Sequence, residues 1–233
     1  AFRFDRTPER LALAQAAVEA AFRLHPTAGE AHLARANHLY CGHLDDNGAL
    51  SELDLAGQTL PNDSRLFELK GYVERRRPGA NEEDALPDLH RAVELDPRNV
   101  SLLQQTAITY RDLRRYAEEQ AVVDRILAIE PNDVERRTWR AFVDLNWKAD
   151  TQPLHQLIDS VRATTPDALP RIAEEWLICA LAEHDAAAAD SAGRRPPTAG
   201  AGGARSGSAR LVGVPAVVRR SGQCRYPRRQ ARP

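Results

Sequence analysis

Hydrophobic residues recur along this chain at fixed distances from a series of prolines. Five prolines stand 34 to 36 residues apart: Pro26, Pro61, Pro97, Pro131 and Pro166. Aliphatic residues precede each of them by five and by eight positions, as Ala92 and Leu89 precede Pro97. Residues spaced by three share one face of an α-helix, so each proline is predicted to follow a helix with an apolar stripe. Proline ends such a helix because its ring clashes with the preceding turn and it lacks an N–H donor.

A second series of residues, all of them small, repeats in the segment ahead of each of these helices. Its members are Ala36, Gly71, Ala107 and Ala141. Small side chains let two helix backbones approach closely, which predicts a first helix packed against the second in each repeat. Two residues after three of the prolines stand Asp63, Asn99 and Asp133, which are suited to cap the next helix. The pattern therefore predicts helix–turn–helix units and no strands.

The unit from Val100 to Pro131 resembles the tetratricopeptide repeat (TPR), a helix pair with a period of 34 residues. Leu103 stands at the tryptophan place of that pattern, Ala107 at the glycine place, Tyr110 at the tyrosine place and Val123 at the phenylalanine place. The resemblance covers about residues 8 to 185. It implies an all-α fold, a right-handed superhelical α-solenoid of antiparallel helix pairs.

This reading divides residues 1–185 into about four complete helix pairs and a partial repeat at each end. The opening helix is predicted from Pro8 to about Leu24, and a last first-type helix from about Ala168 to Glu183. The segment 77–81 carries extra residues and is predicted to form a longer turn. Three residues depart from the repeat pattern, namely Glu119, Arg137 and Asp144.

The remaining segment, 186–233, has a different composition and is predicted to be a disordered tail. It holds 10 of the 32 basic residues and 1 of the 33 acidic residues, so the tail carries +9 and residues 1–185 carry −10. One interpretation is that the arginines bind nucleic acid or an anionic surface. The other is that the segment is translated out of frame, because the repeat period stops abruptly after the four alanines at 186–189.

Composition narrows the class of protein. A hydrophobic content of 42% is enough for a packed helical core, and no run approaches the 18 apolar residues of a membrane span. Three cysteines, odd in number and far apart, do not predict a disulfide framework, so a reducing, cytoplasmic location is expected. The chain has no methionine and starts within a repeat, which suggests a piece of a longer protein.

No catalytic motif is present in the sequence. It lacks a phosphate-binding loop, a Gly-x-Ser-x-Gly elbow and a kinase signature, so no enzyme and no cofactor are predicted. The one group that resembles a metal site is His32, His38, Cys41 and His43. Their spacings place them on different parts of a helix and match no established zinc motif, so they are interpreted as a solvated helix end and no metal is predicted.

The TPR resemblance implies a concave groove lined by the first helix of each pair. The residues at the family's groove places are Asn37, Tyr40, Tyr72, Arg75, Arg76, Gln104, Ile108 and Arg111. We expect Arg75 and Arg111 to project from exposed helix faces, where guanidinium groups bind carboxylates in a bidentate manner. An ordinary solvated face is the alternative. The clamp with which some TPR proteins grip a chaperone's C-terminal carboxylates is missing, because only Asn37 matches it; the other four places hold Leu33, Leu69, Ser101 and Gln105.

These observations favour a protein-binding scaffold or docking module that holds a peptide or protein segment in its groove. The amino-acid sequence of the repeats, such as Tyr40-Cys41-Gly42-His43, resembles that of the C-terminal TPR arrays of bacterial signalling proteins. In those proteins the array follows a cyclase, a Ser/Thr kinase or a winged-helix regulator. An excess of arginine over lysine, 30 to 2, fits a GC-rich bacterial genome. Nucleic-acid binding through the tail and an enzyme with an unrecognised groove site remain as alternatives.

Overall fold

The computed structural model describes residues 7–193, and within this range the chain forms helices and turns with no strand. The predicted tail from 194 to 233 lies outside the described residues. The described chain divides into two compact units, of which the first ends at Ile129 and the second begins at Glu130. Each unit is built from consecutive helix pairs, as the repeat pattern predicts.

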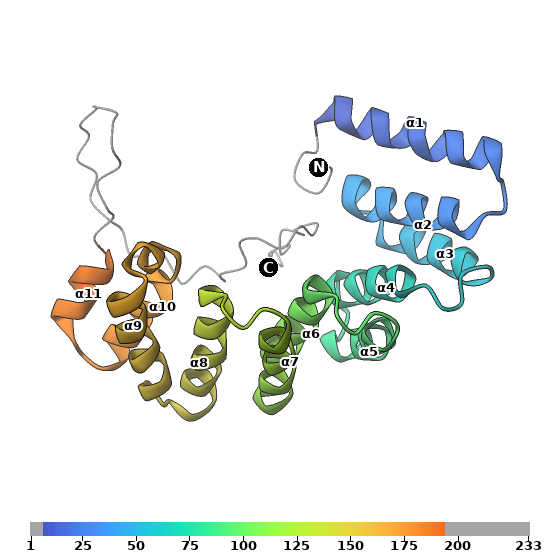
Figure 1. Cartoon of the computed structure of the whole chain (residues 1–233). Helices are drawn as coiled ribbons and strands as arrows, with labels where there is room; N and C mark the ends of the chain where they lie inside the picture. Colours follow the sequence, from blue (N-terminus) through green and yellow to red (C-terminus); the bar gives the residue numbers. More distant parts are fainter. Residues whose placement is uncertain (1–6, 194–233) are drawn as a thin grey trace. The chain divides into compact units, whose positions relative to one another are not determined.

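The first unit contains three helix pairs and an opening helix (Figure 1). Its helices are α1 (Pro8–Leu24), α2 (Gly29–His38), α3 (Asp46–Gly57), α4 (Ser64–Arg76), α5 (Leu86–Leu95), α6 (Val100–Asp112) and α7 (Tyr116–Ile129). The most extensive contacts join α2 to α3, α4 to α5 and α6 to α7. The π-helical turn η1 (Leu39–His43) extends α2, and the 3-10 helix η2 (Glu82–Ala85) leads into α5. The predicted bounds of α1 are confirmed.

The second unit contains two helix pairs. Its elements are α8 (Val134–Lys148), α9 (Gln152–Thr164), the 3-10 helix η3 (Pro166–Arg171), α10 (Ala173–Ala182) and α11 (Ala186–Gly193). Helix α8 packs on α9 and α10 packs on α11, while α9 also contacts α10. The core between them is aliphatic and includes Leu154, Ile158, Val161 and Ile172.

The predicted helix ends and caps are confirmed. Each of the five repeat prolines is exposed and follows the end of a helix by two to four residues. The side chain of Asp63 accepts a hydrogen bond from the Arg65 backbone N–H at 2.9 Å. Asn99 and Asp133 cap α6 and α8 in the same way, through N–H groups at 3.1 and 2.9 Å. These bonds satisfy donors that the first turn of a helix leaves without partners.

The small residues lie where helices approach closely, as the sequence predicts. Ala36 and Ala107 are fully buried. At Gly71 a Cβ atom would lie 2.9 Å from the Leu89 side chain and 3.3 Å from the Ala85 carbonyl oxygen. Since real Cβ atoms do not approach other atoms so closely, the packing of α4 against α5 and η2 requires glycine at this position.

A residue in the left-handed conformation lies between the first and second helix of every pair. These residues are Leu44, Gly79, Arg114, Ala149 and His184, with φ between 54° and 77°. They recur every 35 residues. After Arg114 and His184, the next residue donates its backbone N–H to a carbonyl oxygen of the preceding helix: Arg115 to Tyr110 and Asp185 to Ala180, both at 2.8 Å. This is the common way to close the carboxyl end of a helix. Gly79 lies in the predicted longer turn at 77–81.

Two sequence predictions about the second unit are wrong. The helix expected from about Ala168 begins only at Ala173 and is preceded by η3, because Pro170 cannot donate a backbone hydrogen bond. Residues 186–193, which the sequence assigned to a disordered tail, form α11 and pack on α10. Asp185 starts α11 by accepting bonds from the N–H groups of Ala187 and Ala188, at 3.0 and 2.9 Å. The following alanines have the highest helix propensity of any residue.

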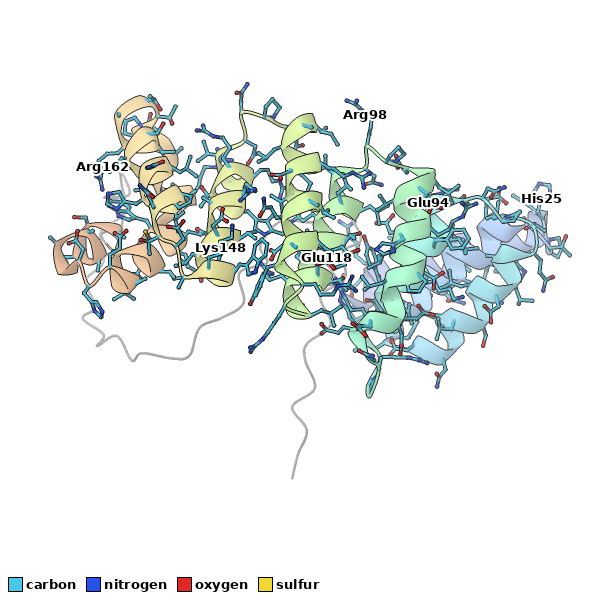
Figure 2. The ribbon with its side chains drawn as sticks, turned by 90° about the horizontal axis from the view of Figure 1, so that it is seen from below. His25, Glu94, Arg98, Glu118, Lys148 and Arg162 are labelled. Carbon is cyan, nitrogen blue, oxygen red and sulfur yellow. The ribbon has the colours of Figure 1, made fainter. Side chains whose placement is uncertain are left out.

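The outward faces of the second helices carry charged side chains. Figure 2 shows Glu94 on α5 and Glu118 on α7, and Arg98 extends from the turn that follows α5. Glu94 is 66% exposed and pairs with Arg91 at 3.0 Å, a contact that contributes little to stability in water. Glu119, the neighbour of Glu118 on α7, is by contrast fully buried. None of the helices in the described range is long and apolar enough to cross a membrane.

Candidate functional site: a pocket between α2 and α4

The first unit has a pocket between the first helices of two successive pairs. Its volume is about 280 Å³. The lining residues come from α2, η1 and α4: Glu30, Leu33, Ala34, Asn37, Tyr40, Cys41, Arg65, Glu68, Leu69 and Tyr72. No second helix contributes to it. The pocket therefore lies on the face where the TPR resemblance places a binding groove.

The floor of the pocket is apolar and rigid. Leu33 and Leu69 are buried, as are the rings of Tyr40 and Tyr72. The Tyr40 hydroxyl donates to the Tyr72 carbonyl oxygen at 3.2 Å, and the Tyr72 hydroxyl donates to a Glu68 carboxylate oxygen at 2.6 Å. Burial raises the pKa of Tyr72 well above its ordinary value, so this hydroxyl stays protonated. Hydrogen bonds thus fix both aromatic side chains.

The rim of the pocket is polar. Asn37 and Arg65 are exposed, and the Asn37 amide offers both a donor and an acceptor. Arg65 is held by Asp63, with an Nη2 to Oδ2 distance of 2.5 Å. The hydrogen bond from Arg65 lowers the pKa of Asp63, so that carboxyl group is ionised at neutral pH. The charge of Arg65 is thereby matched, and the carboxylates of Glu30 and Glu68 give the rim an acidic character.

The structure brings together three of the eight predicted groove residues, Asn37, Tyr40 and Tyr72. The other five lie further along the first helices, outside the pocket: Arg75 and Arg76 on α4, and Gln104, Ile108 and Arg111 on α6. Of these, Ile108 is buried and forms part of the core. Gln104 and Arg111 are half-buried. Seven lining residues were not among the predicted groove residues: Glu30, Leu33, Ala34, Cys41, Arg65, Glu68 and Leu69. All of them except Cys41 precede a predicted position on the same chain segment by one or two helical turns.

Arg75 is not on an exposed face, and that expectation is wrong. Its side chain is only 8% exposed and donates to the Gln105 carbonyl oxygen, the Gln105 side-chain oxygen and the Thr109 hydroxyl, at 3.0, 2.7 and 2.7 Å. Burial, with the neighbouring Arg76, lowers the pKa of Arg75 to about 10, so the group remains charged at neutral pH. Arg75 therefore ties α4 to α6 and is not available to bind a peptide carboxylate.

Arg76 lies between this buried network and the pocket. It donates to the Tyr40 hydroxyl at 2.8 Å, and its guanidinium carbon lies 5.6 Å from the centre of the Tyr72 ring. Arg76 is half-buried. It thus contacts both tyrosines of the pocket floor.

The four residues considered as a metal site in the sequence do not form a common ligand set. His32 pairs with Glu52, with 2.7 Å between Nδ1 and a carboxylate oxygen. His38 and His43 lie side by side, with 3.1 Å between their Nε2 atoms. Within residues 7–193, no three ligand atoms of this group converge on one point. Of the cysteines, Cys179 is a free buried thiol and Cys224 lies outside the described residues.

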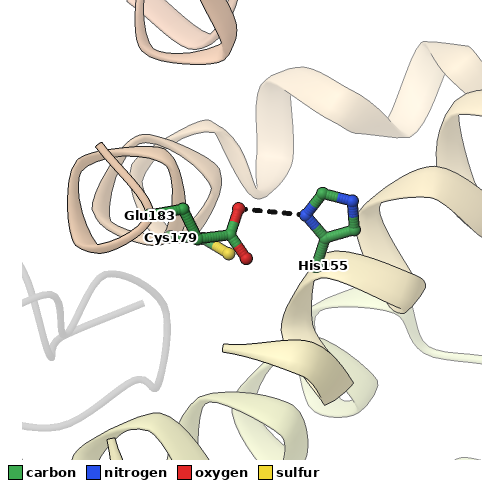
Figure 3. Close-up of side chains that lie close together, drawn as sticks. All are labelled: His155, Cys179 and Glu183. Atoms are coloured by element: carbon green, nitrogen blue, oxygen red, sulfur yellow. Dashed lines mark hydrogen bonds and ion pairs between the residues drawn. The ribbon is translucent and has the colours of Figure 1, made fainter. Parts of the chain in front are cut away.

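A group that sequence reasoning missed lies in the second unit, where His155 of α9 faces Cys179 and Glu183 of the α10 segment (Figure 3). Their ligand atoms all lie within 4.8 Å of one another. The only signal in the sequence is the four-residue spacing of Cys179 and Glu183, which places them on one helix face. His155 stands 24 residues before Cys179. Pattern alone could not join them, because the joining contact is between two repeats.

The same three residues do not form a nucleophile and base of the kind found in cysteine hydrolases. Burial, together with Glu183, raises the pKa of the Cys179 thiol to about 11, so the thiolate nucleophile is scarce at neutral pH. Both ring nitrogens of His155 face carboxylates, at 3.0 Å from Glu183 and 3.2 Å from Asp159. Neither nitrogen is directed at the thiol as a base would be.

The fold is shared with solved TPR proteins of low sequence identity. The chain superimposes on PilW, a type IV pilus biogenesis factor, with a TM-score of 0.61 and 17% identity over 79% of this chain and 83% of the other. The PilF protein of Pseudomonas aeruginosa gives the same score and identity over 79% and 82%. Yeast Tom70 gives a TM-score of 0.60 and 14% identity over 80% of this chain, which spans 40% of Tom70. No family model and no curated protein matches the sequence. These likenesses establish a TPR-like fold.

Proposed function

We propose that this protein is a protein-interaction module that holds an extended peptide segment of a partner in the pocket between α2 and α4. The observation that carries the proposal is the pocket itself, with an apolar floor and a polar rim on the first helices. Such sites are concave and mostly apolar, with a few polar groups that set orientation. The TPR-like fold supports the same class of function, because its likeness is to scaffold proteins.

Asn37 is the residue that would engage the peptide backbone. Its exposed side chain projects at the rim, and a carboxamide can pair with the N–H and the C=O of one peptide unit at once. An apolar side chain of the peptide would fill the hollow above Leu33 and Leu69, where its burial contributes about 1.5 to 3 kcal/mol. The rigid tyrosines beneath reduce the entropy that binding would otherwise cost.

The charges of the rim point to a peptide with a basic residue beside its apolar one. Glu30 and Glu68 are acidic, whereas Arg65 is already paired with Asp63. The net charge of −10 over residues 1–185 acts in the same direction and would speed the encounter with a basic segment. The hypothesis of an acidic ligand rested on Arg75, Arg76 and Arg111, of which Arg75 is buried and none lines the pocket.

The cellular setting is proposed from the sequence. The similarity of the repeats to the C-terminal arrays of bacterial signalling proteins, and the excess of arginine over lysine, favour a docking part of a bacterial regulatory protein in the cytoplasm. A pull-down from bacterial lysate with the pocket variant described next as a negative control would name the partner.

Blocking the pocket tests the function. We expect Ala34→Trp, at an exposed lining position of α2, to fill the hollow and weaken binding of a peptide selected from a random display library by at least about tenfold. Ala117→Trp is the matched control, because Ala117 is an exposed helical alanine of α7 outside the pocket. Fluorescence polarisation of the labelled peptide measures both. Equal affinity of the two variants would refute the assignment of the site.

A second arm tests the proposed charge of the ligand. In the selected peptide, replacement of the basic residue by glutamate should weaken binding to the parent protein, and this effect should shrink in Glu30→Gln. If the library instead returns acidic peptides, the electrostatic part of the proposal fails while the pocket assignment stands.

A further inference from the structure

The second unit holds a cluster of metal-ligating side chains that the peptide-binding function does not use. The cluster lies where α9 contacts α10. His155 projects from α9, whereas Cys179 is on α10 and Glu183 directly follows it (Figure 3). The side chain of His155 is 52% exposed and that of Glu183 is 26% exposed, while Cys179 is 1% exposed. The cluster is therefore open to solvent on one side and bounded by the apolar core on the other.

The three ligand types are those that zinc prefers. Zn²⁺ binds thiolate sulfur, imidazole nitrogen and carboxylate oxygen, and a mixed set of this kind separates it from Mg²⁺ and Ca²⁺, which take oxygen ligands. Without a metal the Cys179 thiol stays protonated, because a thiolate beside Glu183 would be both desolvated and repelled. A divalent cation would satisfy both negative groups together.

The distances suit a metal after small side-chain movements. Bond lengths of about 2.0 to 2.3 Å in a tetrahedral site place neighbouring ligand atoms about 3.3 to 3.6 Å apart. The His155 Nδ1 to Glu183 Oε2 distance is 3.0 Å, and all three ligand atoms lie within 4.8 Å of one another. Both His155 and Glu183 are partly exposed, which leaves their side chains room to rotate toward a common metal.

The far nitrogen of His155 already has the partner that a zinc-bound histidine uses. Its Nε2 lies 3.2 Å from an Asp159 carboxylate oxygen, one helical turn further along α9. Asp159 is in turn held by Arg162 at 2.8 Å. A carboxylate on the second ring nitrogen fixes the orientation of the imidazole and raises its basicity as a ligand. Nδ1 is thereby left to face Glu183.

We propose that His155, Cys179 and Glu183 form a zinc site that joins α9 to the α10 segment, with Asp159 as its positioning residue. Three protein ligands leave the fourth position of the tetrahedron to a water molecule or to a ligand from another molecule. The metal links two successive repeats of the second unit, so its binding free energy adds to the stability of that unit.

Cobalt(II) titration of the full chain under reducing conditions tests the site. Co²⁺ replaces Zn²⁺ in tetrahedral sites and shows a thiolate-to-metal charge-transfer band together with visible ligand-field bands. We expect one equivalent to bind with both signals, Zn²⁺ to displace it, and Zn²⁺ to raise the melting temperature of the parent protein.

His155→Gln is the decisive variant, because His155 is half-exposed and its replacement opens no cavity. It should abolish the visible bands while its circular dichroism stays that of the parent. Cys179→Ser should lose the charge-transfer band, and Asp159→Asn should weaken Co²⁺ affinity by about 10- to 100-fold without removing a ligand. Cys41→Ser and His43→Gln, in the first unit, are matched controls that should bind Co²⁺ like the parent.

Two results would overturn the proposal. One is the absence of a stoichiometric Co²⁺ complex with a thiolate band in the parent protein. The other is a complex that His155→Gln leaves unchanged, or that Cys41→Ser or His43→Gln removes, since the metal would then be held elsewhere.

Discussion

Helices α6 and α10 occupy the same place in their repeats and differ sharply in burial. Helix α6 contacts α5, α7 and η2, and eight of its residues are buried, including an unbroken run from Gln105 to Tyr110. Helix α10 contacts α9, η3 and α11, and only Cys179 and Ala180 are buried on it. Leu181 is 59% exposed. Equivalent positions of the repeat therefore carry unequal weight in stability, and the neighbours of each helix decide the difference.

The largest expected effect comes from overpacking α6. Ala107 is fully buried, so Ala107→Leu should lower the free energy of unfolding of the first unit by about 1 to 3 kcal/mol. Ala182→Leu, at an exposed position of α10, should change the stability of its unit by less than about 0.5 kcal/mol. Urea denaturation followed by circular dichroism measures both. Similar effects at the two sites would show that the burial of α6 and α10 does not differ in solution.

The next effect concerns the polar side of α6. Arg75→Ala should lower stability by about 1 to 2 kcal/mol, because buried oxygen atoms of Gln105 and Thr109 lose their donor. Arg111→Ala removes an arginine of α6 that is only half-buried and should have a smaller effect. Thermal unfolding compares them. If Arg75→Ala left the melting temperature unchanged, water would have to replace the hydrogen bonds of the guanidinium fully. The link between α4 and α6 would then contribute nothing to stability.

A smaller effect, equal in the two regions, is expected at the turns. Arg114 follows α6 and His184 follows α10, and both have left-handed backbone conformations that cost less in glycine. Arg114→Gly and His184→Gly should each raise stability by about 0.5 to 1 kcal/mol. Because the conformation rather than burial sets this gain, unequal values in denaturant titrations would point to side-chain contacts instead.

The last effect is a dependence on pH, which concerns the first unit alone. Burial, with a hydrogen bond to Asp88, raises the pKa of Glu74 from 4.5 to about 7. The folded state thus binds more protons than the unfolded state between these values, and its stability should fall as pH rises from about 4.5 to 7. Glu74→Gln should flatten the melting temperature over this range. A melting temperature of the parent that rises through the same window would contradict the shift.

The fold was predictable from the sequence because the residues that repeat at its period start or end helices by themselves. Proline stops and Asp or Asn caps act within a single turn, so their positions were confirmed at Pro97 and Asn99. The start of α10 departs from the repeat pattern because Pro170 breaks the helix there. Helix α11 is longer than the sequence indicates, because the apolar period ends at its four alanines while the helix continues to Gly193.

The sites were less predictable, since they depend on contacts between repeats. Asn37 was found through the TPR resemblance, which assigns a face to each helix position. Arg75 was misplaced because its polar side chain resembles a surface residue until Gln105 and Thr109 of the next repeat are seen around it. His155 and Cys179 lie close together only because α9 packs on α10. No spacing within one helix encodes such a contact.

The left-handed residues divide the chain into segments of equal length, whereas the prolines do not. The prolines are spaced by 34 to 36 residues, whereas Leu44, Gly79, Arg114, Ala149 and His184 are spaced by 35 throughout. A cut made after each left-handed residue yields cassettes of equal length, each with the second helix of one pair and the first helix of the next. Such a cassette begins and ends at the same backbone conformation. Duplication or exchange of a whole cassette in the coding sequence would therefore keep the same left-handed backbone conformation at every joint.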